Sequence, residues 1–177
     1  MTPETFSLIW PEVILAGATL ILLVFGAFRG RGGVLFNGLA VLTLAAAAVA
    51  AIVGPHGRGF AGGLVVDQLA VFAKVAIYAA SAVSIVLGDR WLARKGESKF
   101  EFPVLVLLAA LGMGMMVSAG DLISLYIGVE LHSLALYVLA AFRRDDAKGS
   151  EAGLKYFVLG ALSSGLLLYG ASLIYGF

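Results

Sequence analysis

Apolar residues fill six long runs of the 177-residue sequence, and short polar or glycine-rich stretches separate them. A helix needs about 20 apolar residues to cross the hydrocarbon core of a bilayer. The runs lie at residues 9–28, 34–53, 64–88, 102–120, 122–142 and 153–175. They predict six membrane-spanning helices and an all-α, polytopic transmembrane bundle in a single domain.

The fourth and fifth runs together form an almost continuous apolar segment over residues 102–142. A single helix of this length would measure about 61 Å, roughly twice the thickness of the hydrocarbon core. The chain must therefore reverse direction within the segment. Gly120 and Asp121 have the residue types of a turn, and the Asp121 carboxylate is expected to cap the fifth helix.

The basic residues are distributed unevenly between the loops. Only Arg58 follows the second or fourth span, whereas the loops after the first, third and fifth spans hold Arg29, Arg31, Arg90, Arg94, Lys95, Lys99, Arg143, Arg144 and Lys148. Cytoplasmic loops of membrane proteins are enriched in Lys and Arg. The pattern predicts that these three loops are cytoplasmic and that both chain ends lie on the outer, periplasmic side.

Composition excludes several classes of function. Hydrophobic residues make up 61% of the chain, charged residues 13%, and the mean hydropathy is +1.01. A net charge of +1 provides no field to attract nucleic acid. The absence of cysteine removes disulfides and thiolate ligands, and two isolated histidines, His56 and His132, do not suggest a metal site.

Three ionisable residues, Lys74, Glu130 and Lys155, lie inside apolar runs, where a charge costs about 2.5–3.5 kcal/mol at the helix centre. Glu130 lies about 12 Å from one end of its span and about 18 Å from the other. Helical spacing places Tyr126, Ser133 and Tyr137 on the same face as Glu130. Burial favours a neutral carboxyl group and a nearby cation favours a charged one, so this face is a candidate proton-accepting site.

The two lysines allow more than one interpretation. Lys74 lies about 15 Å into its span, with Asp67 and Tyr78 on the same side, and it could relay a proton or neutralise an acid on another helix. Lys155 is near the end of its span, where its long side chain could also reach the headgroups. A static interhelical ion pair is the alternative for Glu130 and Lys74.

His132 points about 200° away from Glu130 around the helix, toward a different neighbour. Packing or a hydrogen bond is therefore favoured for it over a role in proton relay. Small residues recur every four positions at Ala110, Gly114 and Ser118, a pattern typical of closely packed transmembrane helices.

The stretch DLISLYIGVELHSLALYVLAAFRRDDAKGSEAGLKYFVLGALSSGLLLYGASLIYG, residues 121–176, resembles the subunit N family of bacterial NADH:quinone oxidoreductase, the respiratory complex I. The segment VDQLAVFAK, residues 66–74, is similar to the third helix of the same family, and Trp10-Pro11-Glu12 resembles its entry to the first. By this resemblance Glu130 and Lys155 correspond to the functional glutamate of the fifth helix and the lysine of the sixth. Family members are longer, with broken helices that carry further lysines, so the chain is expected to be the N-terminal part of a longer subunit.

The resemblance implies an antiporter-like, non-redox subunit that translocates protons. In this hypothesis Glu130 is the protonatable switch, and Lys155 and Lys74 are basic neighbours that tune its pKa or relay protons. The supporting hydrogen-bonding groups are Tyr126, Ser133 and Tyr137. The resemblance implies no cofactor in this chain, with NAD, FMN, iron–sulfur clusters and quinone held by other subunits. Other membrane-arm subunits, antiporter-like ones among them, and the lipid of a bacterial inner membrane are the expected partners. The residues alone also fit a stand-alone cation/proton antiporter subunit or a structural membrane scaffold.

Overall fold

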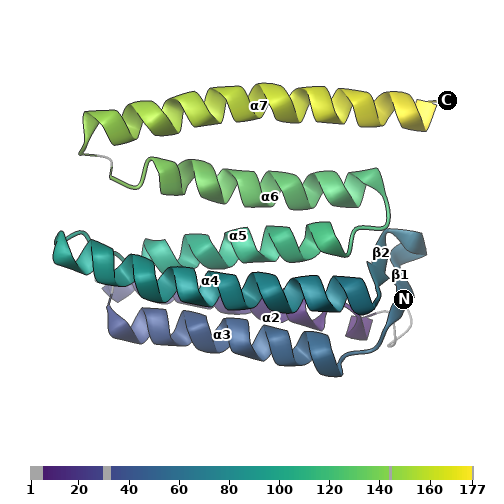
Figure 1. Ribbon diagram of the computed structural model, residues 1–177, viewed down its shortest axis with the longest axis horizontal. Helices are drawn as coiled ribbons and strands as arrows, with labels where there is room; N and C mark the ends of the chain where they lie inside the picture. Colours follow the sequence, from purple (N-terminus) through teal and green to yellow (C-terminus); the bar gives the residue numbers. More distant parts are fainter. Residues whose placement is uncertain (1–5, 30–32, 144, 177) are drawn as a thin grey trace.

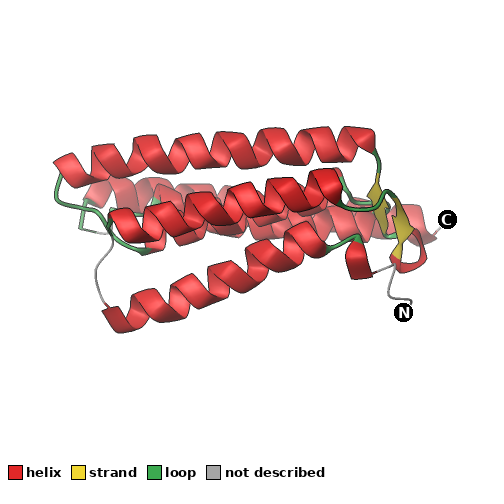
Figure 2. Cartoon of the chain, turned by 90° about the horizontal axis from the view of Figure 1, so that it is seen from below, coloured by secondary structure: helices red, strands yellow, loops and turns green. Residues whose placement is uncertain are grey.

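A computed structural model describes residues 6–29, 33–143 and 145–176. Within these ranges six helices with nearly parallel axes lie side by side, and a short β-hairpin closes one end of the bundle (Figures 1 and 2). The elements are α2 (Trp10–Arg29), α3 (Val34–Val53), β1 (Gly57–Gly59), β2 (Leu64–Val66), α4 (Gln68–Arg94), α5 (Glu101–Val117), α6 (Leu122–Ala140) and α7 (Ala147–Gly176). The all-α helical bundle expected from the apolar runs is confirmed.

Five of these helices are long and apolar enough to cross a membrane, and α5 is the exception. It has 17 residues, which gives a length of about 26 Å. The fourth apolar run continues to residue 120, but the helix ends at Val117 because the next residues bond to the hairpin. Ser118 accepts a hydrogen bond from the Val65 N–H, and the Gly120 N–H donates to Gly63.

The hairpin replaces the expected beginning of the third span. Strand β2 pairs antiparallel with β1, and α4 begins only at Gln68. The connection between the strands contains Phe60 and Ala61 with φ of 53° and 55°. Asp67 sets the start of α4, since its carboxylate accepts a hydrogen bond from the Ala70 N–H at 2.7 Å. Periodicity alone does not separate a short apolar strand from the first turn of an apolar helix.

The turn at Gly120 and Asp121 is confirmed. The Asp121 carboxylate accepts a hydrogen bond from the Ser124 N–H at 2.6 Å and so caps α6. This backbone hydrogen bond lowers the pKa of Asp121 from its ordinary value, because it stabilises the charged form. The helix α6 ends at Ala140, and α7 begins at Ala147, six residues before the sixth apolar run.

The core lies between α2, α3, α4 and α5, where Leu15, Leu44, Ile85 and Leu107 are fully buried. Helix α6 packs on α5, and α7 packs on α6 as the outermost helix (Figure 1). The contact between α5 and α6 is close because a Cβ at Gly112 would lie 2.5 Å from the backbone nitrogen of His132. Most side chains of α7 are exposed.

The two ends of the bundle differ in charge. The end of α2, the beginning of α3, the α4–α5 loop, the end of α6 and the beginning of α7 lie at one end of the bundle, here called the basic end (Figure 1). The hairpin and the α5–α6 turn lie at the other, here called the hairpin end. Arg58 is on the hairpin, whereas Arg29, Arg90, Arg94, Lys95, Lys99, Arg143 and Lys148 lie at or near the basic end. Arg31 and Arg144, which also entered the orientation argument, lie outside the described residues.

Candidate functional site

Glu130 faces α7, where Ser164 contacts it. The Ser164 hydroxyl lies 2.5 Å from Oε2 of Glu130 and 3.2 Å from the hydroxyl of Tyr126. Tyr126 precedes Glu130 by one helical turn, so both side chains leave α6 on the side that faces α7. Glu130 is half-buried, as are Tyr126 and Ser164. The shared face of Tyr126 and Glu130, predicted from their spacing, is therefore present in the structure.

The three oxygens form a short line of hydrogen bonds. A serine hydroxyl carries one proton, so Ser164 donates to the carboxylate of Glu130 and accepts from the hydroxyl of Tyr126. When Glu130 takes up a proton, the direction of these bonds can reverse, because a hydroxyl both donates and accepts. The arrangement can hold a proton at Glu130 and pass it through Ser164 to Tyr126, one turn nearer the hairpin end of α6. Sequence reasoning did not single out Ser164, because its contact with Glu130 depends on how α7 packs against α6.

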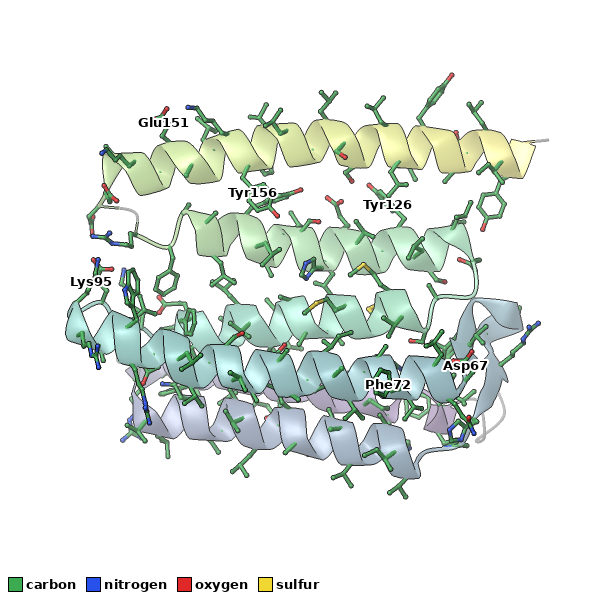
Figure 3. All side chains as sticks on the ribbon, viewed as in Figure 1. Asp67, Phe72, Lys95, Tyr126, Glu151 and Tyr156 are labelled. Atoms are coloured by element: carbon green, nitrogen blue, oxygen red, sulfur yellow. The ribbon has the colours of Figure 1, made fainter. Side chains whose placement is uncertain are left out.

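The other hydroxyl-bearing residues of this face have different surroundings. Tyr137 is buried against Gly160 of α7, and its ring meets Tyr156 edge to face with centroids 4.9 Å apart. Figure 3 shows Tyr126 and Tyr156 in the layer between α6 and α7. Ser133 is half-buried on α6 between Glu130 and Tyr137. Tyr137 thus packs the two helices together on the basic-end side of Glu130.

Lys155 lies away from Glu130. Its ammonium pairs with Glu151 at 2.5 Å, and the two side chains are 70% and 62% exposed. Glu151 lies on the outer side of α7 (Figure 3). Nine residues separate Lys155 from Ser164, which corresponds to about 13 Å along the helix axis. The structure therefore places Lys155 in an exposed ion pair rather than beside the carboxylate.

Lys74 pairs with an acid that the sequence reasoning did not assign to a site. Its Nζ lies 2.6 Å from Oε1 of Glu12, and the side chains are only 1% and 12% exposed. This ion pair joins α4 to α2. Tyr78 is buried one turn further along α4, and its hydroxyl lies against Gly114 of α5. A basic residue that neutralises a buried acid on another helix was one of the two alternatives for Lys74, and the structure shows that contact.

The remaining candidates have local structural roles. Asp67 caps α4, as described above. His132 faces α5, where its Nδ1 lies 3.3 Å from the carbonyl oxygen of Ala109, so the predicted difference in direction from Glu130 is confirmed. Across the part of the chain that the structure describes, acidic and histidine side chains do not gather in threes as they would around a metal ion.

The geometry thus separates two sets of polar groups, one half-buried and one largely buried. Glu130, Ser164 and Tyr126 lie between α6 and α7, whereas Glu12 and Lys74 lie between α2 and α4. Helix α5 lies between the two sets in the order of packing. A buried ionisable residue in a membrane protein usually marks an ion or proton pathway.

Comparisons with known proteins give the same family for both halves of the chain. Residues 119–177 match the family described as NADH:quinone oxidoreductase/Mrp antiporter, TM. The chain is 73% identical over 172 residues to NADH-quinone oxidoreductase subunit N of Caulobacter sp. (strain K31), which covers 97% of this chain and 36% of that protein. It is 51% identical over 180 residues to the same subunit of Rhodobacter capsulatus, covering 100% of this chain and 38% of the relative.

A solved structure has the same fold. A chain in respiratory complex I from Thermus thermophilus with bound aureothin is 31% identical, with a TM-score of 0.76, over 94% of this chain and 36% of that chain. The chain spans about 36% of the length of the curated relatives it matches, at their N-terminal side.

Proposed function

Because the chain resembles the N-terminal portion of NADH-quinone oxidoreductase subunit N, we propose that it forms this portion of the subunit in a bacterial respiratory complex I. In that assignment it is a multi-pass part of the membrane arm, in the plasma membrane, and it takes part in coupling electron transfer from NADH to quinone to proton translocation. The observation that carries the proposal is the 73% identity to a subunit N over 97% of the chain.

Glu130 is the proposed protonatable group. Its carboxylate is the acceptor at the end of the line of hydroxyls formed by Tyr126 and Ser164. A cation that approaches Glu130 stabilises the charged carboxylate and releases a proton, and withdrawal of the cation favours uptake. Lys155 lies on the same helix as Ser164 and would need to leave Glu151 to act as this cation. Lys74 serves in its own ion pair with Glu12.

The electron-transfer chemistry belongs to other subunits in this proposal. NAD, FMN, iron–sulfur clusters and quinone are assigned to them, and none to this chain. The partners are the other membrane-arm subunits, including antiporter-like ones. The basic end faces the cytoplasm and the hairpin end the periplasm, in line with the excess of Lys and Arg at the basic end.

Replacement of Glu130 in the full-length subunit tests the proposed role. Glu130→Gln keeps the size of the side chain and removes the exchangeable charge, so the complex is expected to assemble while NADH-driven proton pumping falls. Pumping is measured in inverted membrane vesicles, and assembly is measured on a native gel stained for NADH oxidation. Asp145→Asn, an amide for a carboxylate on the exposed loop before α7, is the matched control. Unchanged pumping by an assembled Glu130→Gln complex would rule out the role.

A second candidate is a subunit of a cation/proton antiporter that works without electron transfer. It is favoured by the matched family, whose description includes Mrp antiporters. The same native gel separates the two candidates. Migration in a large band that oxidises NADH supports complex I, whereas a smaller species whose proton transport follows a sodium or potassium gradient supports the antiporter.

A further inference from the structure

A long apolar groove runs over α5 between α4 and α6, and Gly149 in the first turn of α7 borders it. It has a volume of about 470 Å³ and is lined by α4 and α6, with residues of α5 between them. Val106, Ala109, Met113, Leu136 and Leu139 supply much of its wall. Neither the Glu130 site nor the ion pair between α2 and α4 contributes a residue to it.

The groove extends from the middle of the bundle to the basic end. On α4 its lining runs from Ser81 to Leu92, and on α5 from Phe102 to Met113. Each stretch rises by eleven residues, or about 16 Å, close to half of the hydrocarbon thickness of about 30 Å. The groove therefore has the length of an acyl chain in one leaflet.

Ser84 and His132, two of the polar residues at the deep end of the groove, contact backbone carbonyl oxygens of the bundle. The Ser84 hydroxyl donates to the carbonyl oxygen of Ala80 at 2.9 Å, and His132 contacts the carbonyl oxygen of Ala109. A ligand in this region would therefore meet a mainly apolar surface. This favours a hydrocarbon chain over a ligand with a polar group at its buried end.

Two lysines lie against aromatic rings that line the mouth of the groove, although neither lysine lines the groove itself, and Lys99 borders a neighbouring hollow. Trp91 and Phe142 line the mouth, and each ring carries a lysine: the Nζ of Lys95 lies 4.5 Å from the Trp91 centroid, and that of Lys99 lies 5.8 Å from the Phe142 centroid. Figure 3 shows Lys95 at the basic end of α4. A tryptophan at this depth is typical of the membrane interface, and basic pockets between transmembrane helices attract anionic headgroups.

Arg143 also lines the groove at its mouth, where it contributes a guanidinium group. It is held by Glu97, with 3.0 Å between Nε and Oε2, and by Asp146, so its charge is balanced within the protein. Lys95 and Lys99 rest on aromatic rings, which leave the ammonium charge uncompensated. The uncompensated positive charge near the mouth thus belongs to the two lysines that rest on its aromatic rings.

We propose that this groove binds an anionic phospholipid from the leaflet at the basic end, with one acyl chain between α4 and α6 and the phosphate near the aromatic rings of Trp91 and Phe142, within the field of Lys95 and Lys99. The apolar lining, the length of half a bilayer and the paired ammonium groups each match one part of this ligand. The site lies apart from the proton-carrying residues of the proposed function and does not depend on them.

Photochemical labelling of the full-length subunit in its purified complex tests the proposal. The probe is phosphatidylglycerol with a photoactivatable diazirine in the acyl chain, and phosphatidylcholine with the same chain is the headgroup control. Phosphatidylglycerol is expected to label the segments around Met113 and Leu136 at least fivefold more than phosphatidylcholine. Lys95→Gln with Lys99→Gln is expected to bring the labelling ratio of the two lipids close to one, since each charge near an anionic headgroup contributes about one factor of five.

A groove-filling variant provides a second test. Ala140→Trp places an indole in the groove from α6, and it should reduce labelling at least fivefold. Ala45→Trp, on the exposed surface of α3, adds the same indole elsewhere and should leave labelling unchanged. Equal labelling by the two lipids would overturn the proposal. So would a cross-link from a photoreactive residue at position 136 to another protein segment, because a helix would then occupy the groove.

Discussion

The ion pair between Glu12 and Lys74 gives a strong prediction about stability. Both side chains are buried, at 12% and 1% exposed, and their charged atoms are 2.6 Å apart. Lys74→Met removes the ammonium and leaves the Glu12 carboxylate without its partner. Loss of one member of a buried pair costs about 3–5 kcal/mol. Glu12→Gln, which strands the ammonium instead, should destabilise the chain by a similar amount.

The double variant separates a pairing effect from simple loss of volume. When Glu12→Gln and Lys74→Met are combined, no buried charge remains, and replacement of a complete pair is often close to neutral. The free energy of unfolding should therefore return to within about 1 kcal/mol of the parent. Tryptophan fluorescence during titration with dodecyl sulfate in mixed micelles measures it, since Trp10 lies two residues before Glu12.

The exposed pair on α7 provides a matched control. Lys155 and Glu151 have a similar charge separation, but their side chains are 70% and 62% exposed. Lys155→Met should therefore change stability by no more than about 0.5 kcal/mol. The reasoning is refuted if the double variant of Glu12 and Lys74 is as unstable as either single variant, because the two charges would then not act as a pair.

Three further predictions follow from other contacts. Ser164→Ala removes the hydroxyl that donates a hydrogen bond to Glu130. A hydrogen bond to a charged group contributes about 1.5–3 kcal/mol. This variant should therefore lower NADH-driven proton pumping in vesicles of the assembled complex, whereas Ser163→Ala, the control, should not. Gly112→Ala forces a Cβ to within 2.5 Å of the α6 backbone and should destabilise the chain by about 1–3 kcal/mol in the dodecyl sulfate titration. The control is Gly17→Ala, because a Cβ at Gly17 would have no neighbouring atom within 4 Å. This variant should be neutral or stabilising by up to about 1 kcal/mol. The pKa of the Asp121 carboxyl is lowered in the folded state, so its contribution to the stability of the fold is complete above the ordinary pKa of 3.8. This contribution is lost as the pH falls through the lower pKa of the folded state. The midpoint of the dodecyl sulfate titration, measured as a function of pH, should show this loss in the parent and not in Asp121→Ala.

Local features of the sequence predicted much of the bundle. Apolar runs long enough to cross a membrane predicted the helices, and the polar break at Gly120 and Asp121 predicted the turn between α5 and α6. The spacing of Tyr126 and Glu130 gave their common face on α6. Each of these inferences depends on residues within a few turns of one another, where helical geometry fixes their relative positions.

Contacts between distant helices were not predictable in the same way. Glu12 and Lys74 are 62 residues apart, and the sequence does not specify which faces of α2 and α4 meet. Ser164 belongs to a run of small residues that also suits helix packing, so its contact with Glu130 depends on the rotation of α7. The strand at Leu64–Val66 was taken as helical because three apolar residues fit either structure.

The backbone links between the hairpin and the α5–α6 turn determine where α6 can pivot. Ser118 and Gly120 are bonded to the hairpin, and Leu64 forms a bridge with Ala119. If α6 tilts, it therefore rotates about its hairpin end. Glu130 lies about 12 Å along the helix axis from Leu122, the first residue of α6. A tilt of about 10° would shift the Glu130 backbone by about 2 Å. Such a displacement is enough to make or break the hydrogen bond between Glu130 and Ser164, while the hairpin end of α6 stays in place.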